Sequence, residues 1–254
     1  MSGQDDDFYV GYLPTPRKHR RFLRAFIPAT LWGLVMIAAL FLSSFRPAGS
    51  GEWDTANLRS WSGVVRFDPY PTLVVAGEDG ESEEWLLVET GKMAADARAE
   101  FFTGKFTVVR GFALQRDGRR MIEIMPGHEG MLAPVEGEIP VEPIAKSHGE
   151  VELSGEILDM KCYLGAMLPG DGLTHQTCAR LCIDGGIAPM LVSHSEDGQL
   201  TYTLLTSVDG GRANELVRRH VAVPVVVRGE LVQRGGTRLL RLAPADAVRK
   251  QFSN

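Results

Sequence analysis

One stretch near the start of the chain is continuously apolar, whereas the rest carries its hydrophobic residues in short runs. Residues 26–45 contain no charged side chain, and about 20 apolar residues in a helix cross a hydrocarbon layer of about 30 Å. We therefore expect a transmembrane helix at 26–45. The rival interpretations are a cleaved signal peptide and a buried helix of a soluble protein. Arg46-Pro47 stands where small residues would precede a cleavage site, which disfavours the signal peptide.

Basic residues flank this apolar run unequally. Only Arg46 follows closely, whereas five basic residues precede it: Arg17, Lys18, Arg20, Arg21 and Arg24. Because Lys and Arg accumulate on the cytoplasmic side of a membrane, we expect residues 1–25 to form a cytoplasmic basic tail. The expected location is the bacterial inner membrane, crossed once, with the N-terminus cytoplasmic and the C-terminal domains in the periplasm.

The later hydrophobic runs are short, rich in β-branched residues and separated by turn residues, as in β-strands. One set of strands is predicted near 62–67, 72–76, 85–89, 105–113 and 119–124, and a second near 152–158, 189–194, 201–206, 223–232 and 237–242. Helices are expected at 92–102 and 212–220, between the third and fourth strand of each set. The predicted fold class is therefore mainly β.

The two sets of strands are related by an internal duplication. Residues 71–118 align without a gap on 189–236, and the pattern V-V-R-G-x3-Q-R-x-G at 108–118 returns at 226–236. Upstream, residues 62–65 match 154–157 at an offset of 92 instead of 118. The second copy therefore carries an insertion between its first two strands, which we place at 160–187.

A strand order of β-β-β-α-β-β with a glycine in the fourth strand, Gly111 or Gly229, resembles the OB-fold, a five-stranded Greek-key barrel. The resemblance implies two tandem OB-like barrels after the transmembrane helix, at 46–125 and 150–243, with a linker at 126–149 and a C-terminal tail at 244–254. A single β-sandwich is the alternative. In an OB-fold the loop that carries the insertion borders the ligand-binding face.

Composition and cysteine content narrow the function. A formal charge of −5 and a pI near 5.7 disfavour a nucleic-acid-binding protein, so no nucleic-acid partner is expected. The chain has three cysteines, Cys162, Cys178 and Cys182, and all of them lie in the insertion. The insertion is therefore the first place to look for chemistry.

The insertion reads C-x12-H-x2-C-x3-C, and its single histidine is His175. A short helix is predicted to begin at His175 under a Thr174 cap and to end at Gly185-Gly186. Positions three and four apart share a helix face, so His175, Cys178 and Cys182 should project together, with Cys162 approaching from the preceding strand. Cys162, His175, Cys178 and Cys182 would form a Cys3His site suited to zinc or iron. The flanking Lys161 and Arg180 are expected to be solvated.

Two other readings of the cysteines stay open. An exported protein often forms disulfides, so Cys162 can pair with Cys178 or Cys182. In this alternative the insertion is held by a structural disulfide and binds no metal. Alternatively, Cys178 can act as a nucleophile activated by His175, with Cys182 as the resolving thiol of a thiol-disulfide oxidoreductase. The absence of a C-x-x-C motif disfavours this enzyme.

The segment Cys162-Tyr163-Leu164-Gly165 with His175, Cys178 and Cys182 resembles bacterial membrane-anchored proteins of uncharacterised activity. The architecture is similar to membrane-anchored periplasmic OB-fold proteins, such as the haem chaperone of cytochrome c maturation. No H-x-x-x-Y motif of that family follows Leu242. We expect a non-catalytic accessory or binding subunit of a membrane redox or envelope complex, anchored by its single helix and docked on a protein partner. A structural scaffold with a disulfide-stapled loop is a further alternative.

Overall fold

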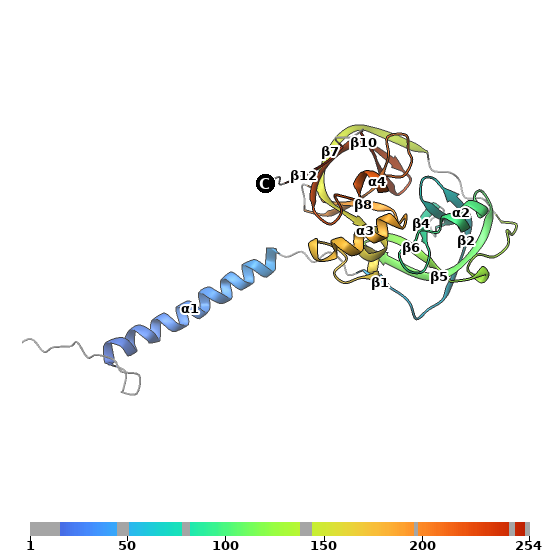
Figure 1. Cartoon of the computed structure of the whole chain (residues 1–254). Coiled ribbons are helices and arrows are strands. Elements are labelled where there is room, and N and C mark those ends of the chain that lie inside the picture. Colours follow the sequence, from blue (N-terminus) through green and yellow to red (C-terminus); the bar gives the residue numbers. More distant parts are fainter. Residues whose placement is uncertain are drawn as a thin grey trace, which may run out of the picture. The chain divides into compact units, whose positions relative to one another are not determined.

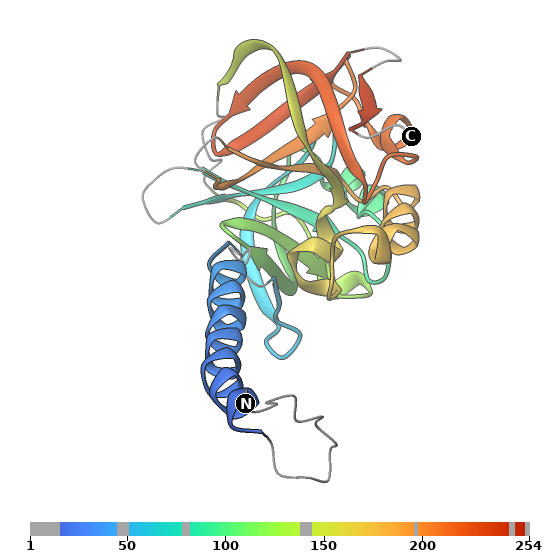
Figure 2. The same ribbon diagram turned by 90° about the vertical axis from the view of Figure 1, so that its left-hand side faces the viewer.

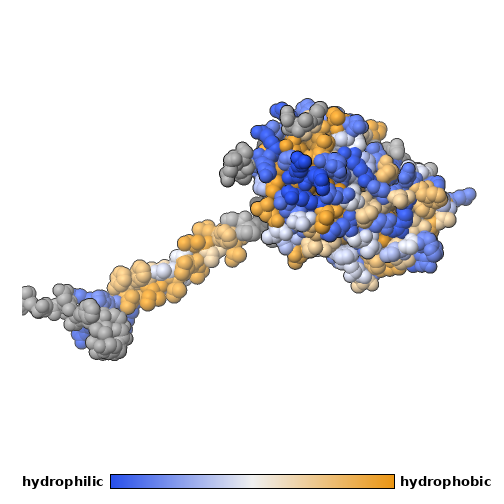
Figure 3. Space-filling view, viewed as in Figure 1, coloured by the Kyte–Doolittle hydropathy of each residue, from blue (hydrophilic) through white to orange (hydrophobic). Residues whose placement is uncertain are grey.

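A computed structural model of the chain describes residues 16–44, 51–77, 82–137, 144–195, 198–243 and 247–251. The chain divides into two units, residues 1–48 and residues 49–254. In the first unit, helix α1 (Arg17–Ser44) is long and apolar enough to cross a membrane, a property that signal sequences share. It begins nine residues before the predicted span, so the basic residues of the predicted tail lie in its first turns. Its apolar side chains are exposed over most of its length (Figure 3).

The first repeat folds into a closed five-stranded barrel. Its strands pair in the ring β5-β2-β3-β4-β6, and β6 pairs back with β5. A sixth strand, β1 (Glu52–Trp53), adds to the outside of β5. The ring consists of β2 (Arg59–Phe67), β3 (Pro71–Ala76), β4 (Ser82–Val88), β5 (Phe106–Arg116) and β6 (Arg119–Ile124), with helix α2 (Asp96–Phe102) between β4 and β5.

The second repeat uses the same order of pairings. Strand β7 pairs with β8 and β10, β8 with β9, β9 with β11, and β11 with β10, while β12 adds to the edge of β10. These elements are β7 (Ala145–Asp159), β8 (Pro189–His194), β9 (Leu200–Thr206), β10 (Pro224–Arg234), β11 (Thr237–Leu242) and β12 (Val248–Lys250), with helix α4 (Asn214–Val217) between β9 and β10.

The glycine shared by β5 and β10 has the same physical role in both repeats. A Cβ atom on Gly111 would lie 2.2 Å from the carbonyl oxygen of Glu123, and one on Gly229 would lie 2.2 Å from that of Arg241. Because such contacts are far inside van der Waals distance, only glycine lets the paired strand approach this closely. The sequence pattern that revealed the duplication therefore marks a backbone requirement.

The prediction of a mainly β chain with an apolar N-terminal helix is confirmed, and all ten predicted strands are present. The short strands β1 and β12 were not predicted, and β7 begins at Ala145, inside the predicted linker. The helix expected at 212–220 is reduced to the four residues of α4.

The two repeats pack on one another through a shared core (Figures 1 and 2). Tyr70 of the first repeat is buried among second-repeat residues, donates a hydrogen bond to the carbonyl of Leu205 (2.9 Å) and accepts one from the amide of Ala213 (3.1 Å). Leu114 and Met121 of the first repeat belong to the same buried cluster. The region between the repeats is therefore a continuous interior, and the cysteine insertion lies along it.

Candidate metal centre

The insertion folds into three short helical segments between β7 and β8. They are η2 (Cys162–Ala166), η3 (Leu173–His175) and α3 (Gln176–Asp184). Segment η2 contacts β1, β5 and β6 of the first repeat as well as β7 of its own, so the insertion joins both sheets (Figure 2). The predicted helix is confirmed, and it ends at Asp184 with Gly185 in the C-cap position. The predicted Thr174 cap is wrong, because His175 occupies the N-cap position and no side chain caps the helix.

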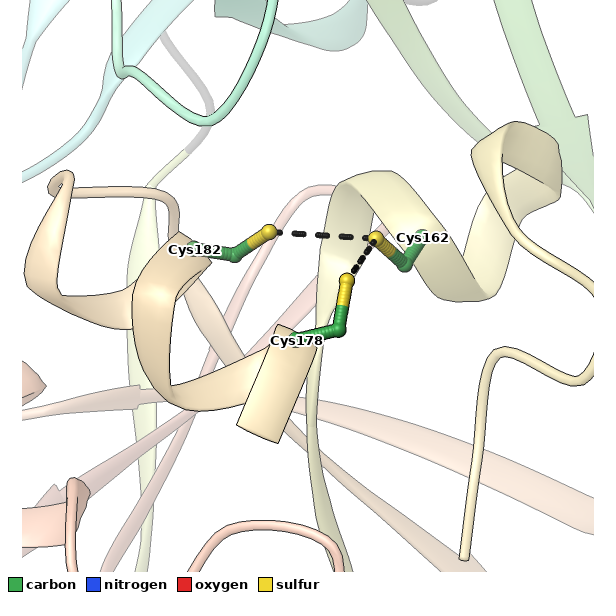
Figure 4. Close-up of side chains that lie close together, drawn as sticks. All are labelled: Cys162, Cys178 and Cys182. Carbon is green, nitrogen blue, oxygen red and sulfur yellow. Dashed lines mark hydrogen bonds between the residues drawn. The ribbon is translucent and has the colours of Figure 1, made fainter. Parts of the chain in front are cut away.

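The three cysteine sulfurs form a small triangle (Figure 4). The Sγ atom of Cys162 lies 3.8 Å from the Sγ atoms of both Cys178 and Cys182, and all three sulfurs lie within 4.8 Å of one another. A tetrahedral metal ion with metal–sulfur bonds of about 2.3 Å separates its sulfur ligands by about 3.8 Å. The two edges from Cys162 therefore match the ligand spacing of a tetrahedral thiolate site, and the third edge is no longer than 4.8 Å.

All three cysteines are free thiols. A disulfide requires two sulfurs about 2.05 Å apart, and the 3.8 Å separations are far longer. The alternative of a disulfide-stapled insertion therefore has no bonded pair to support it. Cys162 and Cys182 are buried, whereas Cys178 is partly exposed and gives the cluster its access to solvent.

His175 reaches the cluster from the side of Cys162. Its Nε2 atom lies 3.0 Å from Oδ2 of Asp159, and the other oxygen of Asp159 accepts a hydrogen bond from the Cys162 amide (2.9 Å). Asp159, Cys162 and His175 are all buried, and their ligand atoms lie within 4.8 Å of one another. The structure thus brings His175 to Cys162, in a second group that contains Asp159 in place of Cys178 and Cys182. Sequence reasoning missed Asp159, although it stands three residues before Cys162.

A lysine from the other repeat completes the surroundings of the thiols. Lys92, between β4 and α2, places its Nζ atom 2.6 Å from the Sγ of Cys178 and 3.7 Å from that of Cys182. The hydrogen bond to Cys178 raises the pKa of Lys92, because the sulfur favours the charged ammonium. No sequence spacing links Lys92 to the insertion, so only the packing of the two repeats reveals it.

Close backbone contact at the end of α3 brings this lysine into place. A Cβ atom on Gly185 would lie 1.7 Å from the carbonyl oxygen of Lys92, and the amide of Ala94 donates a hydrogen bond to the carbonyl of Gly185 (2.9 Å). Gly186 follows with a φ of +87°, a conformation that favours glycine. The glycine pair predicted to end the helix therefore also seats the Lys92 segment against it.

Lys161 is buried, so the expectation that it is solvated was wrong. Its Nζ atom lies 2.5 Å from Oε2 of Glu123 in β6 and donates hydrogen bonds to the carbonyls of Glu89 (2.8 Å) and Gly91 (2.6 Å). Both side chains of the ion pair are at least nine-tenths buried. This ion pair connects the start of the insertion to the first repeat, next to the segment that carries Lys92.

The charges around the sulfurs differ from one thiol to the next. A hydrogen bond to Cys182, burial and the carboxylate of Asp159 together raise the pKa of the Cys162 thiol, so Cys162 holds its proton in the absence of a bound cation. Cys178 instead faces the Lys92 ammonium. A metal cation bound to the triangle would offset the cost of ionising Cys162, because thiolate ligation displaces the thiol proton.

The sequence matches no protein-family model, and no curated protein or solved structure has significant similarity to it.

Proposed function

We propose that the chain is a membrane-anchored accessory protein that binds one thiophilic metal ion, zinc or iron, through Cys162, Cys178 and Cys182. The observation that carries this proposal is the sulfur triangle with two 3.8 Å edges. Three cysteines from two helical segments, brought to tetrahedral ligand spacing in the interior of a protein, are typical of metal sites. Plain burial of three thiols does not require such spacing.

The fourth ligand in this proposal is His175, as the Cys3His pattern predicts. Asp159 occupies Nε2 of the imidazole, which leaves Nδ1 as the ring nitrogen that Asp159 does not use. A metal-bound histidine usually donates its other ring N–H to a carboxylate or carbonyl. The buried Asp159 would then fix the orientation of His175 and hold Cys162 through its amide at the same time.

The location and architecture proposed here follow from the sequence pattern. Helix α1 would anchor the chain in the bacterial inner membrane, and the positive-inside bias would place residues 49–254 in the periplasm. The matching order of strand pairings in the two repeats supports two OB-like barrels derived by duplication. Exposed apolar residues of the insertion, Leu168, Leu173 and Leu181, support docking of a protein partner from a membrane redox or envelope complex.

Metal analysis of the full chain tests the proposal. The protein is purified in detergent under reducing conditions, loaded with zinc or iron(II), desalted and assayed for metal per chain. We expect about one ion per chain, lost in Cys162→Ser, Cys178→Ser and Cys182→Ser. Thr177→Ala, an exposed neighbour on α3, is the matched control and should retain the metal. A folded wild-type protein whose three thiols all remain titratable in the presence of stoichiometric metal would overturn the proposal.

One observation favours a second function, that of a thiol-disulfide oxidoreductase. The Lys92 ammonium 2.6 Å from Cys178 stabilises negative charge on the sulfur, and Cys178 is the accessible thiol. Cys182 is the resolving thiol that the sequence suggests. The Sγ atom of Cys162 also lies 3.8 Å from that of Cys178. Reduction of a disulfide substrate that survives metal chelation and fails in Cys178→Ser would favour this function over metal binding.

A further inference from the structure

A cavity of about 270 Å³ lies between the two repeats, and none of the three cysteines lines it. Equivalent positions of the duplication line it, since Leu86 corresponds to Leu204, Gly118 to Gly236, and Arg120 to Arg238 at the constant offset of 118. Met160 and Met190 add further apolar surface. The hairpin turns β5–β6 and β10–β11 therefore meet at one hollow, with an apolar wall and arginines beside it.

Two of the arginines that line the cavity are neutralised by carboxylates. Arg120 forms an ion pair with Glu83. Arg234 Nε lies 3.3 Å from Oε1 of Glu84, and its Nη1 lies 3.1 Å from Oδ2 of Asp68. The three acidic residues that line the cavity are thus engaged by two of its four arginines.

The other two arginines, Arg119 and Arg238, have no carboxylate partner among the residues that the structure describes. Arg119 donates to the carbonyl of Gly236 (3.2 Å), but its Nε is buried without an acceptor. Burial and the nearby Arg238 guanidinium lower the pKa of Arg119, while Tyr202 opposes the shift. Two like charges beside an apolar hollow, one with an orphaned donor, are the arrangement that an anion would relieve.

We propose that this cavity binds a small organic anion, a monocarboxylate with an apolar body. The carboxylate would accept hydrogen bonds from Arg119 and Arg238, and the body would lie against Leu86, Leu204 and Met190. Arginine forks match carboxylate geometry, and a volume at the lower end of ligand pockets limits the body to a small ring or a short acyl chain. The hydroxyl of Tyr202 already donates to Asp117, so the guanidinium groups define the anion end. This site is independent of the proposed metal centre.

Benzoate is the probe, and benzyl alcohol is its uncharged counterpart. Isothermal titration of the full chain in detergent, with blank titrations into detergent alone, should show benzoate binding at least about tenfold more tightly than benzyl alcohol. Arg119→Gln and Arg238→Gln should each weaken benzoate binding about tenfold. Arg228→Gln, on the exposed side of β10 and outside the cavity, should leave binding unchanged.

A further variant and a further probe test the apolar part of the site separately from the arginines. Leu86→Trp, which fills the cavity from a partly exposed position, should abolish benzoate binding with all arginines intact. Thermal unfolding of each variant establishes that it is folded. Equal affinity for benzoate and benzyl alcohol, wild-type affinity in both arginine variants, or no benzoate binding at all would overturn the proposal. Two results together would overturn the proposal that the ligand is an organic anion. These are phosphate binding as tight as benzoate binding in the wild type, and phosphate binding that Leu86→Trp leaves unchanged.

Discussion

The ammonium of Lys92 lies 2.6 Å from the sulfur of Cys178, although the two residues belong to different repeats of the duplication. The contact exists because the insertion packs against the loop before α2, where Gly185 touches the backbone of Lys92. The first repeat, which has no cysteine, therefore supplies the positive charge that faces the thiols of the second. The first repeat is therefore part of the surroundings of the candidate site.

Replacing Lys92 with methionine should slow the chemistry of Cys178. Loss of the ammonium removes the charge that stabilises the thiolate, so alkylation of metal-free protein by iodoacetamide near neutral pH should slow by about tenfold. Mass spectrometry of the Cys178 peptide over time measures the rate. Lys146→Met, on an exposed part of β7, is the control. An unchanged rate in Lys92→Met would show that the lysine does not act on the sulfur.

Removing one partner of the buried Lys161–Glu123 ion pair should destabilise the protein more than neutralising both partners together would suggest. Lys161→Met leaves the Glu123 carboxylate buried without its cation and should cost about 3–5 kcal/mol in the free energy of unfolding. The double variant Lys161→Met/Glu123→Gln should lose less than the sum of the two single changes, because no lone charge remains. Urea unfolding of the full chain in detergent gives all three values. Arg249→Gln, which breaks an exposed pair with Glu152, should cost about 0–1 kcal/mol.

Gly185→Ala tests whether the backbone contact between Gly185 and Lys92 positions the lysine. The added Cβ would lie 1.7 Å from a backbone oxygen, so α3 and the loop must separate. We expect a loss of about 1–3 kcal/mol in stability, as for overpacked cores, and a Cys178 alkylation rate as slow as in Lys92→Met. Gly236→Ala, whose Cβ would have no neighbour within 4 Å, is the matched control. Wild-type reactivity in Gly185→Ala would mean that the lysine reaches the sulfur without this contact.

Sequence periodicity was sufficient for ten of the twelve strands that the structure describes, and it was insufficient for the surroundings of the site. The ten strands follow from local alternation of residues, and the V-V-R-G pattern marked Gly111 and Gly229, whose backbone contacts lie within each repeat. Helical spacing correctly brought Cys178 and Cys182 to one face, near Cys162. The sequence did not identify Lys92 and Glu123 as part of these surroundings. Their contacts with the insertion depend on how the two repeats pack, which no local pattern encodes.

Asp159 lies between these two cases, because it is close to Cys162 in the sequence but its role depends on packing. It lies three residues before Cys162, but its role depends on η3, which returns His175 to within 3.0 Å of its carboxylate. Lys161 is the opposite case, since an isolated lysine is ordinarily expected at the surface. It is buried here because Glu123 and two carbonyls from the first repeat surround its ammonium.

His220 should make the fold sensitive to mild acid. Burial, followed by the charges of Lys250 and Arg219, lowers the pKa of His220 below its ordinary 6.5, and its Nδ1 is buried with no hydrogen-bond partner among the described residues. The unfolded chain therefore binds a proton first as pH falls, and stability is lost from about pH 6.5 downward, until the folded-state pKa is passed. His220→Gln should reduce the fall in melting temperature between about pH 7.5 and about pH 5 by up to about 2–4 °C, whereas exposed His148→Gln should not. Equal falls in wild type and His220→Gln would exclude this histidine as the source.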